Sequence, residues 1–236
     1  MILYVNGDSH SAGAEAVNSY CFAEDDPLYY ALGRIPHPDN EKVSYGCQLA
    51  NLFGAVLHCD AESAASNDRI LRTTYKYLED NKPDLVVIGW TTWEREEWLH
   101  EGVYYQVNAS GIDYVPPELQ EKYKQWVIDQ NNDVCTSKMN SWHHKIHFLH
   151  EHLETLKIPH VFFHVMNHFY RPAEDNIWSN SFIHPYNQDG TYYHWSIANG
   201  AKSYIPGSYH LDADAHRVWA DLLYQHIKNN KLISND

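Results

Sequence analysis

The sequence has no long apolar run: apolar stretches such as residues 85–88 and 161–163 are only as long as a strand. A helix that crosses a bilayer needs about 20 apolar residues, so we expect no membrane span. The first residues also lack the basic and apolar segments of a secretory signal. Together these absences favour a cytoplasmic protein.

Basic residues and cysteines are also few. The 236 residues include 17 Lys and Arg against 31 Asp and Glu, which gives a net charge of −14. So acidic a chain is poorly suited to bind nucleic acid or an anionic membrane. The four cysteines are scattered without a Cys-x-x-Cys pair, so we expect free thiols in a reducing compartment and no disulfide framework.

Apolar runs and helical periodicities alternate along the chain. Strands are predicted at 2–5, 55–59, 85–90 and 161–166, and helices at 41–53, 68–78, twice between 116 and 157, and from about 212. This alternation predicts an α/β fold, with a parallel sheet covered by helices on both faces. We expect a single domain over 1–236, with long inserted loops near 12–40, 93–116 and 168–200.

Two segments far apart in the chain bring chemically active groups to this frame. Gly7-Asp8-Ser9-His10 forms the turn after the first predicted strand, where substrate reaches the carboxyl edge of a parallel sheet. His210 precedes the last predicted helix, whose dipole disfavours a charged imidazole. A histidine kept neutral in this way can act as a base near pH 7.

The Gly-Asp-Ser turn and the late His-Leu step resemble those of the SGNH (GDSL-type) hydrolase family, and the resemblance covers nearly the whole chain. It implies a flavodoxin-like three-layer fold and the hydrolysis or transfer of an ester-linked acyl group. Ser9 would attack and His210 would take its proton, with no cofactor or metal. The substrate would be a small-molecule or glycan acyl ester. The Gly-Asp-Ser-His variant also resembles phage-encoded and acyl-handling members, which leaves a phage origin open.

The chain departs from the family pattern beside the base. The family has Asp three residues before its catalytic histidine, and this chain has Gly207. Asp212, Asp214 or a main-chain carbonyl could orient His210 instead. We favour the carbonyl, because both aspartates fall at a helix start, where capping already gives them a role.

The oxyanion donors depart as well, since Thr91 stands where the family has Asn and no glycine donor is evident after the second strand. We expect the oxyanion to be received by the Ser9 N–H, Asn67 and Thr91. Losing one donor typically costs about 10²–10³ in rate, so an inactive relative remains an open alternative.

His216 is a rival base, although its place inside the last helix favours a packing role. Aromatic and polar rings near the site could contact a sugar, or could form the core of a self-packed loop. The substrate-binding candidates are His10, Trp90, Trp178, Tyr186 and Trp195.

His143, His147 and His150 share one face of a predicted helix, at a spacing that can ligate zinc. We interpret them as a solvated, weakly basic face, with a zinc hydrolase as a weaker option. A non-catalytic glycan-binding or virion-associated module on the SGNH frame is the main alternative to an esterase.

Overall fold

The computed structural model describes residues 1–21, 36–109, 111–112, 115–130, 132–169, 178 and 180–233, and it contains a four-stranded parallel sheet. The strands are β1 (Ile2–Asn6), β2 (Val56–Cys59), β3 (Leu85–Trp90) and β6 (His160–His164). Their order is β2-β1-β3-β6, and every neighbouring pair is parallel. The predicted α/β class with a central parallel sheet is confirmed.

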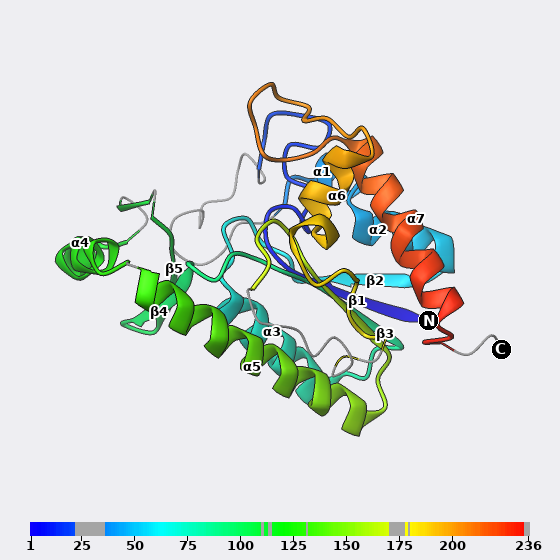
Figure 1. The fold of residues 1–236 in the computed structure, drawn as a ribbon, viewed down its shortest axis with the longest axis horizontal. Coiled ribbons are helices and arrows are strands. Elements are labelled where there is room, and N and C mark those ends of the chain that lie inside the picture. The colour runs from blue at the N-terminus through cyan, green and yellow to red at the C-terminus, as the bar shows by residue number, and fades with distance from the viewer. Residues whose placement is uncertain are drawn as a thin grey trace.

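Helices cover both faces of this sheet (Figure 1). On one face lie α2 (Tyr45–Phe53), α6 (Tyr192–Ala198) and α7 (Ala213–Asn229), and on the other lie α3 (Asn67–Asp80) and α5 (Asn132–Leu156). Alternate strand residues point to opposite faces. Leu3 and Val5 therefore join the α2–α7 core, whereas Tyr4 joins the α3–α5 core.

The second helix predicted between 116 and 157 carries a periodic stripe of apolar residues, and α5 buries this stripe against the sheet. Trp142, Ile146, Leu149 and Leu153 recur at helical spacing and are all buried against the sheet. Truncating one such buried Leu or Ile to Ala typically costs 2–5 kcal/mol. Most of the stability of this helix therefore comes from packing on the sheet.

Two predicted segments differ from the structure. The stretch near 93–116 was expected as a loop, but it contains an antiparallel hairpin of β4 (Glu96–His100) and β5 (Val103–Val107). The predicted helix 41–53 is divided into α1 (Pro38–Glu41) and α2, because the Ser44 hydroxyl caps α2 by accepting from the Cys47 N–H.

Shorter elements complete the described chain: the 3₁₀ turns η2 (Pro117–Leu119) and η4 (Gln188–Gly190), and helix α4 (Gln120–Ile128). The other two expected loops fall partly outside the described residues, at 22–35 and at 170–177 and 179. In the described ranges, no helix is both long and apolar enough to cross a bilayer.

Candidate active site

Ser9, His210 and Glu15 form a continuous chain of contacts at the carboxyl end of β1. The Ser9 Oγ lies 2.9 Å from Nε2 of His210, and Nδ1 of the same ring lies 3.0 Å from Oε2 of Glu15. Ser9 follows β1, and His210 stands two residues before Asp212, which caps α7. The fold thus joins the two residues singled out in the sequence, 201 positions apart.

The carboxylate of Glu15 sets the hydrogen positions on the His210 ring. An ionised carboxylate can only accept, so Nδ1 of His210 carries the hydrogen and donates it. A neutral ring then has its lone pair on Nε2, facing the Ser9 hydroxyl, which donates to it. This arrangement can remove the hydroxyl hydrogen of Ser9 and stabilise the resulting imidazolium.

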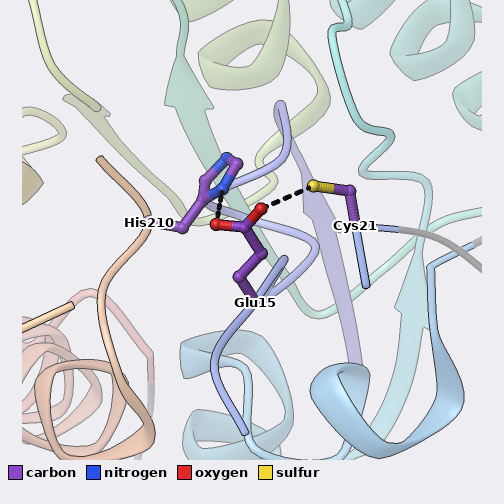
Figure 2. Close-up of side chains that lie close together, drawn as sticks. All are labelled: Glu15, Cys21 and His210. Carbon is purple, nitrogen blue, oxygen red and sulfur yellow. Dashed lines mark hydrogen bonds and ion pairs between the residues drawn. The ribbon is translucent and has the colours of Figure 1, made fainter. Parts of the chain in front are cut away.

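Glu15 is itself held from several sides. Its oxygens accept hydrogen bonds from the Ser208 hydroxyl and from the Cys21 thiol, whose Sγ lies 3.3 Å from Oε1. Figure 2 shows the carboxylate of Glu15 between His210 and Cys21. The hydrogen bond with His210, together with that from Ser208, outweighs partial burial and lowers the pKa of Glu15 to about 2. Glu15 therefore stays ionised across the neutral range.

Glu15 replaces all the groups expected to orient His210, so the favoured main-chain carbonyl was wrong. The Asp212 carboxylate accepts from the Ala215 N–H as the cap of α7, and Asp214 pairs with Arg217 at 3.5 Å. The helix-capping role predicted for Asp212 thus accounts for that carboxylate. No motif marks Glu15, which lies six residues after Ser9 in a segment of weak periodicity.

Two further histidines lie behind His210 and are buried. The ring of His10 meets that of His210 edge-on at 5.0 Å, and Nδ1 of His216 accepts from the Tyr45 N–H at 3.2 Å. Burial lowers the pKa of each to about 3, so both are neutral near pH 7. His216 is thus a packing residue, as expected, whereas a substrate contact by His10 stays a prediction.

Two of the expected oxyanion donors are engaged elsewhere. The side chain of Asn67 donates to the Thr91 carbonyl at 3.1 Å and accepts from the Thr91 N–H at 3.0 Å. The Thr91 hydroxyl donates to Asp8 at 2.6 Å, and Arg95 also pairs with Asp8 at 3.2 Å. These hydrogen bonds connect the loops around Ser9, and they occupy the side-chain groups of Asn67 and Thr91 that were predicted to donate to the oxyanion.

Two backbone N–H groups, one after β1 and one in the loop after β2, are further candidates for oxyanion donors. Within the described ranges, neither the Ser9 N–H nor the Ala64 N–H has an acceptor. Ala64 is in the loop that follows β2. This loop is joined to the residue after β1, because the Glu62 N–H donates to the Gly7 carbonyl at 3.2 Å. Ala64 also has a positive φ of 63°, a conformation usually left to glycine. Among the described residues, the loop after β2 thus has a backbone N–H without an acceptor, although the sequence has no glycine there.

The expected aromatic platform is largely core. Trp90 and Trp178 are buried on the α5 face, and Tyr186 stacks on Trp178 at 6.1 Å between ring centroids. Trp195 packs against Trp219 of α7 in the other core. The self-packed loop core, which was the alternative, describes the buried Trp90 and Trp178, whereas substrate contacts by the partly buried Tyr186 and Trp195 stay a prediction.

The histidine-bearing face of α5 is not a solvated face. His143 is buried, with Nδ1 3.0 Å from the Tyr186 hydroxyl, and His150 is buried with Nδ1 2.8 Å from Nε2 of His160. Across the described part of the chain, the trio of His143, His147 and His150 does not gather its ring nitrogens around one point. The zinc hydrolase option loses its basis.

No protein-family model matches this chain. No curated protein matches it in sequence either. Among solved structures, it is similar to a carbohydrate esterase with divergent catalytic and non-catalytic binding functions, at 14% identity and a TM-score of 0.47. That match covers 97% of this chain and 64% of the other.

A carbohydrate esterase family 2 enzyme with a carbohydrate-binding domain, from Corynascus thermopiles (Myceliophthora fergusii), matches at 15% identity and a TM-score of 0.44, over 98% of this chain and 66% of that one. An acetyl xylan esterase from the rumen bacterium Butyrivibrio proteoclasticus matches at 12% identity and a TM-score of 0.43, over 98% and 64%. The chain thus spans about two thirds of the length of these structures. Likenesses this distant carry no argument about its activity.

Proposed function

We propose that this protein is a serine esterase of the SGNH type, with Ser9, His210 and Glu15 as its catalytic triad. The observation that carries the proposal is the unbroken chain of contacts from Ser9 Oγ through His210 to the Glu15 carboxylate. A serine hydroxyl is a weak nucleophile until an adjacent base takes its proton. Here the base is oriented by a carboxylate, which is the arrangement that activates serine in unrelated hydrolases.

The reaction follows from these contacts. Ser9 Oγ attacks the acyl carbon of the ester while its proton passes to Nε2 of His210. Glu15 stabilises the imidazolium, and the N–H groups of Ser9 and Ala64 donate to the oxyanion. The bond to the alcohol breaks as His210 returns the proton to the leaving oxygen. Water then loses a proton to His210 and attacks the acyl-Ser9 carbon. The bond from that carbon to Ser9 Oγ breaks as His210 returns the proton to Oγ, which releases the acid and restores the serine.

We place the ester on a carbohydrate, as an O-acyl group. Two exposed tyrosines support this assignment: Tyr209 precedes His210 and is 67% exposed, and Tyr20 is 43% exposed. The Tyr20 carbonyl accepts from the Glu15 N–H at 3.1 Å, so its backbone lies beside the triad. Exposed tyrosine rings on residues adjacent to the triad could offer an apolar face to a sugar, although one face of the Tyr20 ring stacks on His37 at 5.4 Å between centroids.

Covalent labelling tests the nucleophile. A fluorophosphonate probe should modify Ser9 in the wild type and nothing in Ser9→Ala, and p-nitrophenyl acetate hydrolysis should disappear in parallel. Ser11→Ala is the matched control: it removes a buried hydroxyl of the same turn that contacts the Tyr45 hydroxyl, and it should keep both labelling and turnover. Stoichiometric labelling of Ser9→Ala would refute the assignment, and absence of labelling in the wild type would favour a non-catalytic module.

Kinetics test the carbohydrate. Tyr209→Ala should raise the KM for an acetylated oligosaccharide while leaving the KM for p-nitrophenyl acetate unchanged, since only the larger substrate reaches the ring. An equal change in both KM values, or in neither, would remove the sugar contact from the proposal and leave the triad untouched.

A further inference from the structure

A second group of ligand-type side chains lies at the opposite edge of the sheet from Ser9. His150 and Glu154 lie one turn apart near the end of α5, and His160 is the first residue of β6. Each of the three offers one ligand atom, and these atoms all lie within 4.8 Å of one another. This cluster is at the amino end of β6, whereas the catalytic groups lie at the carboxyl end of β1.

The hydrogen bonds of His160 leave one of its nitrogens suited to bind a cation. Nδ1 lies 2.9 Å from the Ile158 carbonyl, which can only accept, so this nitrogen carries the hydrogen. The lone pair is then on Nε2, which faces Nδ1 of His150 at 2.8 Å. Proteins commonly orient a metal-binding histidine in this way, with the second nitrogen donating to a carbonyl.

The surroundings also suit a cation. Both imidazoles are buried. Glu154 is exposed, and with His160 it borders a cavity of about 250 Å³. Lys157 lines the same cavity.

We propose that His150, Glu154 and His160 form a binding site for a divalent cation of the zinc class. Two imidazoles and a carboxylate are ligands that zinc accepts, with water from the cavity in the fourth position. At Zn–N bonds of about 2.0–2.1 Å, tetrahedral geometry separates two nitrogens by about 3.4 Å. The rings of His150 and His160 therefore move apart by roughly half an ångström, and the His150 hydrogen moves from Nδ1 to Nε2.

Such a cation would join the end of α5 to the start of β6. Lys157, in the turn between them, has a positive φ of 55°, and β6 is the last strand of the sheet order. A ligand bound only by the folded state raises the apparent stability of that state. The role of this site is therefore structural, and it does not depend on the proposed esterase activity.

The test is zinc binding by the full chain after dialysis against a chelator. Glu15, Cys21 and His210 also place ligand atoms within 4.8 Å of one another, so titrations are made in wild type and in a Cys21→Ser background that disables that second group. Calorimetry of the Cys21→Ser protein should give one equivalent of Zn²⁺, and its Tm should rise on addition of the metal.

Matched variants locate the site. In the Cys21→Ser background, Glu154→Gln should weaken zinc binding at least tenfold and abolish the Tm shift. Its side chain is exposed, so the fold is kept. Glu151→Gln, which removes an exposed carboxylate from the same helix, should bind as its parent does. His160→Gln should also lose the metal. No binding in the Cys21→Ser protein, or binding that survives Glu154→Gln, would overturn the proposal.

Discussion

Histidines on the two faces of the sheet have different surroundings, and comparing them identifies what makes one histidine reactive. His210, on the α7 side, is partly exposed and has a carboxylate on one nitrogen and a serine hydroxyl on the other. His164, on the α5 side, is fully enclosed by the rings of Phe169, Phe182 and Tyr186. Neither ring nitrogen of His164 has a hydrogen-bond partner among the described residues.

Burial lowers the pKa of His164 well below its ordinary value. A neutral imidazole without a partner can neither take a proton from a neighbour nor stabilise the charge that follows. The residue type is the same on both faces, so the difference in chemistry comes from the partners and from access to solvent.

The largest effect should come from exchanging the reactive histidine itself. His210→Ala is expected to lower kcat by about 10⁴-fold or more, because His210 is the base that contacts Ser9 Oγ among the described residues. His164→Phe, which keeps a ring in the opposite core, should leave kcat close to wild type. The measurement is kcat for ester hydrolysis by both purified variants, with circular dichroism to confirm folding. A similar loss of kcat in both variants would contradict the claim that His210 is reactive and His164 is not.

Removing the carboxylate partner should have the next largest effect. Glu15→Gln keeps the size of the side chain but not its charge, so we expect kcat to fall by about 10²–10⁴. Asp212→Asn and Asp214→Asn should retain near-normal turnover, since neither carboxylate contacts His210. A large loss of kcat in an aspartate variant, with kcat of Glu15→Gln unchanged, would show that Glu15 is not the acid that orients His210.

Acid stability should depend on the buried histidine His216. Burial lowers the pKa of His216 from 6.5 to about 3. Its contribution to stability is therefore complete above pH 6.5 and is lost as the pH falls toward 3, by up to about 1.4 kcal/mol per pH unit. Denaturant unfolding between pH 7 and 4 should show a shallower loss for His216→Gln than for wild type. An unchanged slope in His216→Gln would contradict this account.

The smallest effect concerns the aspartate that caps α7. Asp212→Ala removes the acceptor for the Ala215 N–H and should lower the free energy of unfolding by about 1 kcal/mol. Turnover should be unchanged at temperatures well below Tm. Loss of turnover without loss of stability would mean that Asp212 acts on His210 after all.

Local patterns in the sequence were enough to predict much of the frame. The apolar run 85–90 and the stripe of Trp142, Ile146 and Leu149 depend on periodicity within one element, and the structure buries them as expected. The hairpin at 96–107 was missed because alternation there is weak. It buries Trp98 and Val107 in a small separate core with α4.

The sequence by itself determined that a serine follows the first strand and that a histidine precedes the last helix, because topology sends both to one edge of a parallel sheet. Only the tertiary structure decided which acid meets His210. Glu15 and His210 are 195 residues apart, and no periodicity links a loop residue to a partner so distant. It also decided that Asn67 and Thr91 bind each other and that Trp90 and Trp178 are core. Hydrogen bonds and burial depend on which loops fold together, and composition alone does not specify that.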